Sequence, residues 1–204
     1  MSVPRTAAHE LPPEELAYRF QSGRLCLDFV ATVGERWRRS FERLRTPEDL
    51  SGWFVSAALL DDRVVDVRPR ELREARVLRE AIYRLAKGAA SSAADPADIE
   101  VLNRYAVKPA LAPQLTPRRE LSWIFKRPVE AALSTIARDA IDLLAGPLAG
   151  RVRECGRPDC ALLFVDTSRA GRRRWCSMET CGNKAKTSAY RARRRAAANE
   201  GDAG

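Results

Sequence analysis

Histidine, long apolar runs and common catalytic motifs are scarce in this 204-residue chain. Its one histidine, His9, leaves most acid–base and metal-assisted reactions without their commonest participant. Residues 1–150 contain no P-loop, GxGxxG, GxSxG or HExxH pattern. No stretch approaches the roughly 18 consecutive apolar residues of a membrane-spanning helix. We therefore expect neither an enzyme nor a membrane protein.

The first residues, MSVPRTAAHELPPEE, also lack an apolar core behind a basic start, so we expect no secretory signal there. Overall, 45% of the residues are hydrophobic and 31% are charged, which is typical of a soluble globular protein. Together these features predict a cytoplasmic location.

Positive charge is concentrated at the carboxyl-terminal end. The formal net charge is +9; residues 1–150 hold 23 basic and 21 acidic residues, whereas residues 151–204 hold 13 basic and 6 acidic residues. A surplus localised in this way indicates a polyanionic partner such as nucleic acid. An acidic membrane surface would need an apolar anchor, which the segment lacks.

Four of the five cysteines fall within 27 residues, and each of the two pairs encloses four residues. In a chain without a secretory signal, this clustering predicts metal binding rather than disulfides. Four thiolates suit one tetrahedral zinc ion and fill its coordination shell, so we expect a structural rather than a catalytic site. The predicted ligands are Cys155, Cys160, Cys176 and Cys181.

Helical patterns dominate the first 150 residues. Apolar spacing, prolines and the capping sequence Thr46-Pro47-Glu48-Asp49 predict helices at about 25–33, 47–57, 69–88, 96–105 and 128–146. Cys26, Trp53 and Trp123 are expected in the core. The mixed charges of residues 70–87, such as Glu80 and Arg84, predict a solvent-exposed helix face.

Three prolines exclude a helix between residues 107 and 127, where alternating residues predict a small β-hairpin. The sequence GPLAG, at 146–150, is the expected domain boundary. We therefore predict a mainly α protein. A helical domain, residues 1–150, would serve sensing or dimerisation. A treble-clef-like ββα zinc module, residues 151–204, would have strands within 162–167 and 171–176, joined by a turn, and a basic helix.

The carboxyl-terminal segment resembles the CGNR zinc finger, which is named for its last cysteine and the three residues after it. Here they are Cys181-Gly182-Asn183-Lys184, preceded by a matching DTSRAGRRRWCSMET and followed by an arginine-rich end. Lysine in place of the eponymous arginine keeps the charge and loses the bidentate geometry.

Upstream, GRLCLDFVATVGER at residues 23–36 resembles the start of the ABATE domain, which commonly precedes this finger. Members of that family often have Asn-Thr where this chain has Ala31-Thr32. The resemblance implies a predicted, stress-related bacterial transcription regulator with a helical amino-terminal domain and a DNA-binding finger.

Ten basic residues and one acidic residue lie between Arg169 and Arg195. On a helical wheel, a stripe of alanines that includes Ala189 and Ala192 would pack against the finger and leave a cationic face outward. Such a face suits the major groove of DNA, with phosphate contacts from the preceding arginines. The predicted contacts are Arg169, Arg172, Arg173, Arg174, Lys184, Lys186, Arg191, Arg193, Arg194 and Arg195.

Other partners and roles are compatible with the same residues. RNA or an acidic protein would also suit the basic helix, and loss of zinc through cysteine oxidation would make a switch. Alternatively, the amino-terminal domain binds a small molecule or is enzymatic, with the finger as an RNA- or protein-binding scaffold. Asp28 would then line a ligand pocket; otherwise it is exposed or paired with Arg24.

The patterns identify no effector, target sequence or direction of regulation. Symmetric reading of DNA would favour a homodimer, although the chain shows no heptad seam.

Overall fold

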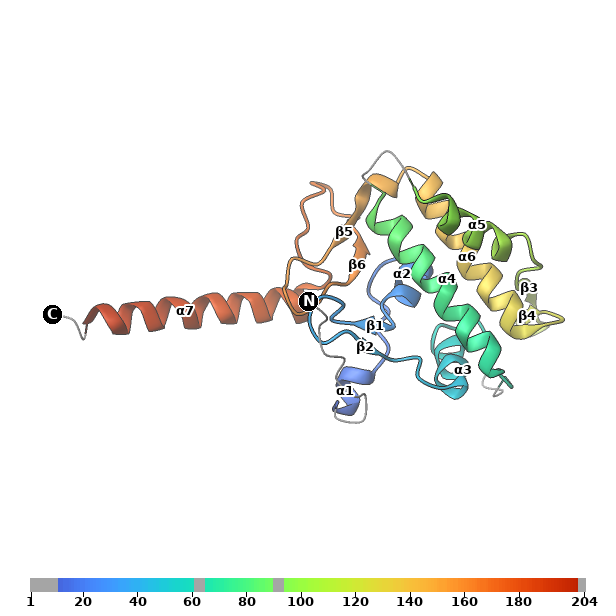
Figure 1. Ribbon diagram of the computed structural model, residues 1–204, viewed down its shortest axis with the longest axis horizontal. Helices are drawn as coiled ribbons and strands as arrows, with labels where there is room; N and C mark the ends of the chain where they lie inside the picture. The colour runs from blue at the N-terminus through green and yellow to red at the C-terminus, as the bar shows by residue number, and fades with distance from the viewer. Residues whose placement is uncertain (1–10, 61–64, 90–93, 202–204) are drawn as a thin grey trace.

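The computed structural model describes residues 11–60, 65–89 and 94–201, with side chains described up to residue 194. The single histidine, His9, lies outside these ranges. This part of the chain is mainly helical and contains three separate two-stranded antiparallel sheets (Figure 1). The predicted fold class is confirmed. No helix within these ranges is long and apolar enough to cross a membrane.

The helices begin at prolines more often than not, because a proline at the first position loses no intrahelical hydrogen bond. Their bounds are α1 Pro13–Leu16, α2 Leu25–Val30, α3 Pro47–Ser56, α4 Pro69–Lys87, α5 Pro96–Ala106, α6 Pro128–Ala145 and α7 Asn183–Gly201, with a 3-10 turn η2 Ala149–Arg151 and a π-helical turn η3 Met178–Gly182.

The cap predicted for α3 is present. The Thr46 hydroxyl accepts a hydrogen bond from the Asp49 amide, and the Asp49 carboxylate accepts one from the Thr46 amide, so two of the helix's first donors are satisfied. At α5, the Asp95 carboxylate accepts a hydrogen bond from the Ala97 amide.

The strands are short and pair in sequence order. They are β1 Val33–Gly34 with β2 Phe41–Glu42, β3 Ala112–Leu115 with β4 Leu121–Ile124, and β5 Val152–Glu154 with β6 Leu163–Val165. The β3–β4 pair confirms the predicted hairpin. Two predictions were wrong. Helix α2 stops at Val30, because Val33 pairs with Glu42, and residues 171–176 form a loop, because β6 pairs with the upstream strand β5.

The main core surrounds α2, which packs between α4 and α6 while α5 covers the other side of those helices (Figure 1). Cys26 and Trp53 are fully buried, as predicted, and the Trp53 ring lies 5.0 Å from that of Phe29. Trp123 is only partly buried and donates a hydrogen bond to the Ala58 carbonyl.

A buried ion pair ties α4 to the β1–β2 segment. Arg79 is 3% exposed and donates to both carboxylate oxygens of Glu42, at 2.7 Å each. Glu80 accepts from Arg36 and Arg79 instead of extending toward solvent, and Arg84 pairs with Asp98 on α5. The predicted solvated face of α4 is therefore partly an interface.

Strand β6 is buried on both faces. Leu163 and Val165 belong to the helical core, while Phe164 packs with Leu162 among the clustered cysteines. This period-two alternation makes β6 a wall shared by the helical domain and the cysteine module.

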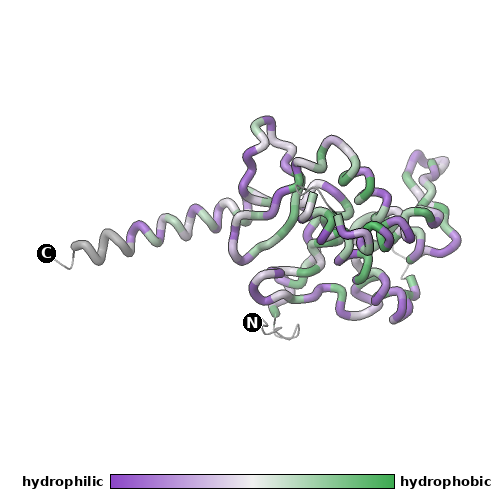
Figure 2. The backbone as a smooth tube through the Cα atoms, turned by 45° about the horizontal axis from the view of Figure 1, so that its top comes forward, coloured by the Kyte–Doolittle hydropathy of each residue, from purple (hydrophilic) through white to green (hydrophobic). Residues whose placement is uncertain are grey.

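Helix α7 extends away from the rest of the molecule, as two views of the chain show (Figures 1 and 2). Ala189 and Ala192 are exposed, and among residues 183–194 only Ala185 is half-buried. The alanine stripe expected to pack against the finger comprises Ala185, Ala189, Ala192 and Ala196. For Ala189 and Ala192 that expectation was wrong, because the finger ends where the helix begins and offers no surface beside them; the Ala196 side chain lies outside the described part.

We predict that replacing Arg79 with methionine destabilises the fold by about 3 kcal/mol, since Glu42, whose side chain is only 16% exposed, would keep no ion-pair partner except Arg76 at 3.7 Å. The matched control is Arg70→Met on the same helix, where Arg70 pairs with Glu74 and its side chain is 81% exposed; its expected cost is below about 0.5 kcal/mol. Urea unfolding measures both. An equal loss of unfolding free energy in the two variants would contradict the role of the Arg79–Glu42 pair in stability.

Candidate metal centre and nucleic-acid interface

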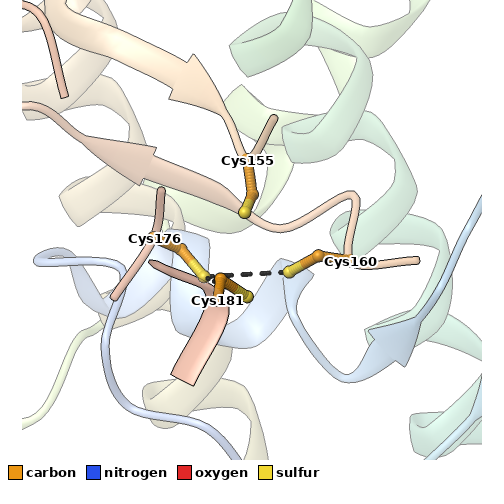
Figure 3. Close-up of side chains that lie close together, drawn as sticks. All are labelled: Cys155, Cys160, Cys176 and Cys181. Carbon is orange, nitrogen blue, oxygen red and sulfur yellow. Dashed lines mark hydrogen bonds between the residues drawn. The ribbon is translucent and has the colours of Figure 1, made fainter. Parts of the chain in front are cut away.

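The four clustered cysteines converge on one point (Figure 3). Their sulfur atoms all lie within 4.8 Å of one another, and three of the four residues are buried. The Cys176 sulfur lies 3.5 Å from that of Cys181 and 3.7 Å from that of Cys160. A tetrahedron of sulfurs at the usual zinc–sulfur distance has edges of about 3.8 Å. The donor set and its spacing therefore fit one zinc ion.

The electrostatics of the thiols support a bound cation. The Cys155 pKa is held far below its usual range by hydrogen bonds from the other three thiols, while the pKa of Cys176 is raised by its contacts with Cys155 and Cys160. The Cys181 pKa is also lowered and that of Cys160 is raised, so the cluster alone favours fewer than four thiolates. A divalent ion removes that conflict, because it stabilises every thiolate at once.

The backbone of the first pair makes a tight knuckle. Cys155, just after β5, donates its amide to the Leu162 carbonyl, and the Cys160 amide donates to the Arg157 carbonyl. The Gly156 amide donates to the Arg174 carbonyl, and a Cβ at this glycine would lie only 3.3 Å from that carbonyl and from the Trp175 ring. A side chain at this position would therefore crowd the contact between the two knuckles.

The second pair, Cys176 and Cys181, lies just before α7. The Ser177 hydroxyl accepts a hydrogen bond from the Thr180 amide, which confirms it as the cap of the turn that carries Cys181. The Asn183 amide group donates to the Glu179 carbonyl. A metal ligand thus lies two residues before the helix, so the metal centre sets where α7 begins and how it is directed.

Arg173 belongs to this framework. Its guanidinium donates to the Trp175 and Cys176 carbonyls and lies over the Phe164 ring, and its backbone amide donates to the fully buried Asp166 carboxylate. In the sequence Arg173 looks equivalent to its neighbours Arg172 and Arg174. In the fold it is half-buried, whereas those two are exposed. Its side chain is engaged in the loop that holds Cys176.

Asp28 also has a role that the sequence did not indicate. Its carboxylate accepts hydrogen bonds from the Gln21 amide and from the amide and hydroxyl of Ser22. Burial raises the Asp28 pKa, and those three hydrogen bonds oppose the rise. The exposed and Arg24-paired alternatives were both wrong, because Asp28 is buried and Arg24 pairs with two aspartates of α6, Asp139 and Asp142.

The loop that Asp28 holds contacts the cysteine module directly. The Ser22 carbonyl accepts the Val165 amide at 2.8 Å, and the Gln21 side-chain amide donates to the Cys176 sulfur at 3.7 Å. Gln21 lies 155 positions from Cys176, so no local motif marks it. The structure thus assigns Asp28 to positioning this loop, while its suggested ligand contact stays a prediction.

The predicted nucleic-acid contacts occupy two segments. Arg169, Arg172 and Arg174 are exposed in the loop between β6 and Cys176, with Arg174 beside the Trp175 ring. On α7, every described basic residue is exposed, namely Lys184, Lys186, Arg191, Arg193 and Arg194. Arg195 lies within the helix, but its side chain is outside the described part.

We predict one zinc ion per chain by elemental analysis. Cys160→Ser should lose zinc, whereas Cys26→Ser should retain one equivalent, because that thiol lies in the helical core.

We further predict that chelating the zinc lowers the melting temperature of the helical domain, because β6 packs against both the helical core and the cysteine module. Circular dichroism would follow the helical transition. An unchanged helical transition after zinc removal would contradict this coupling.

We also predict that Gln21→Leu weakens zinc binding by about 10- to 100-fold, as for other groups that hydrogen-bond a metal ligand. Competition with a chromogenic chelator measures the affinity. Gln114→Leu is the control, since the Gln114 amide donates to the neighbouring Pro113 carbonyl in an exposed strand. Equal zinc affinity of the Gln21 variant and the parent would sink the prediction.

Two family models match the chain. One, ABATE, described as "Putative stress-induced transcription regulator", matches residues 23–147, and the other, the CGNR zinc finger, matches residues 151–194. A comparison with curated proteins gave no match. The matches agree with the helical body and with the four converging cysteines. The chain therefore belongs to the ABATE family and carries a CGNR zinc finger that holds one structural zinc ion.

Proposed function

We propose that the protein is a transcription regulator that binds duplex DNA through α7, with the helical domain serving as a sensor or dimerisation module. The observation that carries the proposal is a basic helix that leaves the body of the protein with nearly all of its described residues exposed (Figure 1). The family descriptions support regulation in general terms.

The dimensions of α7 suit a DNA groove. Its 19 residues correspond to a length of about 28 Å at 1.5 Å per residue. An α-helix with its side chains is about 10–12 Å across, and the major groove of B-DNA is about 12 Å wide. Because the helix projects freely, the protein body does not block its approach to a duplex.

The charge of α7 is distributed over one half of its surface. At 100° per residue, Lys184 and Arg191 lie within about 20° of each other, and Lys186, Arg193 and Arg194 continue round the same half. The opposite side carries the alanines. A helix placed in the groove with the cationic half toward the phosphates would release counterions, which favours binding at low salt.

The helix also lacks the usual source of helical stability. Most helices in proteins are stabilised by packing of an apolar face, and isolated helices shorter than about 12–15 residues are marginal in water. From Lys186 to Arg194 every residue is exposed, so packing within the described chain supports this stretch little. A partner that covers α7 would supply the missing contacts.

Zinc would act in this function as an anchor. Four thiolates leave no open coordination position, so the bound ion stabilises the knuckles without taking part in a reaction. The Cys181 ligand fixes η3, the turn that leads into α7, to the metal, and β6 fixes the module to the helical domain. The direction of α7 relative to the body is thereby defined.

The test is a salt titration of binding between the zinc-loaded protein and random duplex DNA. We expect the logarithm of the binding constant to fall steeply with the logarithm of salt concentration, and Arg191→Gln/Arg194→Gln to lower the slope by about 2, one for each lost phosphate contact. Zinc content and helicity should not change.

The control removes the same charge elsewhere. Arg104→Gln/Arg127→Gln changes two exposed arginines of the helical domain, 61% and 79% exposed at the side chain, and should leave the slope unaltered. Undetectable DNA binding at low salt would refute the proposal. Tighter binding of single-stranded RNA, or equal slopes in both double variants, would also refute it.

A further inference from the structure

A cavity of about 140 Å³ lies between the helical domain and the zinc module. Arg19 and Arg43 line it from the helical domain, and Arg157 and Lys184 line it from the zinc module. We propose that this cavity binds a small oxyanion, that is, the phosphate or carboxylate group of a small metabolite. The inference does not depend on DNA binding by α7.

Arg43 is the central group of the cavity. It is 3% exposed, and its guanidinium donates to the Glu15 carbonyl at 2.8 and 3.1 Å and to the Ala31 carbonyl at 2.9 Å. These contacts occupy three of its five N–H groups, so two donors remain. No carboxylate of the described chain lies within 4.0 Å of it. Arg43 is thus a buried cation with no ion-paired carboxylate; its guanidinium lies over the Phe41 ring, and the charges of Glu42, Cys160 and Glu15 act on it only from beyond ion-pair distance.

The Arg43 pKa reflects that environment. Burial lowers it to about 10, and the nearby charge of Arg19 acts in the same direction. Arg43 nevertheless remains protonated at neutral pH. An anion entering the cavity would offset this unfavourable burial, since a buried charge is stabilised chiefly by an opposite charge with hydrogen bonds.

The acidic groups of the cavity are already engaged. Glu15 and Glu35 both pair with Arg39, at 2.5 and 2.6 Å, and Asp159 pairs with Arg157. Among the described residues, the remaining lining cations, Arg19, Arg43 and Lys184, have no carboxylate within 4.0 Å. The charged side chains that line the cavity, five cationic and three acidic, therefore carry a net charge of +2.

The zinc centre contributes negative charge beside the cavity. One zinc ion with four thiolates carries a net charge of −2. Cys160 and Cys181 line the cavity, whereas Cys155 and Cys176 do not, so the cavity lies outside the sulfur tetrahedron. Arg173 adds a further cation on the Cys176 side. The metal centre therefore balances the net charge of the lining side chains, and what the cavity offers an anion is the local charge of Arg19, Arg43 and Lys184 and the free donors of Arg43.

Size and depth favour a small free ligand. The volume is below the roughly 300–1,000 Å³ of pockets that take drug-sized molecules. Because Arg43 is 3% exposed, a group that contacts it must enter the cavity, which a phosphate on a duplex backbone does not do. A ligand held by Arg43 and Lys184 would join the two modules and stabilise their packing.

The experiment is calorimetric titration of the zinc-loaded, full-length protein with inorganic phosphate, against sodium chloride of equal ionic strength. We expect saturable binding and a rise in melting temperature. Lys184→Gln should weaken binding by about tenfold, the loss of one charge-assisted hydrogen bond. Lys186→Gln removes the same charge two positions along α7, outside the lining, and should change phosphate affinity by less than about twofold.

A second variant tests the buried cation. Arg43→Lys keeps the charge and loses the forked donors, so phosphate binding should weaken while the variant stays folded, as a melt without phosphate would establish. Equal losses in the Lys184 and Lys186 variants would indicate general attraction to the basic helix and overturn the proposal. Absence of binding, or binding only after zinc removal, would overturn it as well.

Discussion

Strand β6 joins the two halves of this protein. Its alternating side chains place Leu163 and Val165 in the helical core and Phe164 among the metal-binding cysteines. A two-stranded hairpin of three residues a side is not stable alone in water, so β5 and β6 depend on both neighbours. The zinc centre and the helical domain consequently stabilise each other, although the chain completes one before it begins the other.

The contacts around this shared wall determine what the zinc centre can do. Asp28 orders the loop at residues 21–22, which hydrogen-bonds both β6 and the Cys176 sulfur. On the other side, Cys181 directs α7 away from the body. Our proposed function uses this arrangement as a rigid platform with one projecting helix, and the proposed oxyanion site would lie where platform and helix meet.

The basic residues divide into two groups that composition cannot distinguish. Arg43, Arg79 and Arg173 donate to carbonyls or carboxylates within the fold, whereas the described basic residues of α7 are exposed. The net charge of +9 counts these internal arginines, so it overstates the positive charge that is available to a partner. It understates how strongly the exposed charge is concentrated on one helix, which is what counterion release depends on.

The sequence by itself determined the features that depend on local spacing: the helix starts at Thr46 and Pro128, the β3–β4 hairpin, the buried Cys26 and the four zinc ligands. Capping, proline geometry and ligand chemistry act over a few residues, so the chain order displays them. The tertiary structure alone decided the partner of β6, the exposure of the alanine stripe and the contacts of Asp28 and Gln21. The Gln21 contact joins residues 155 positions apart. The β5–β6 pair and the Asp28 contacts join segments close in the chain, but they form where the two modules pack together, and the exposed stripe reflects the absence of a neighbouring surface. No local pattern records such packing.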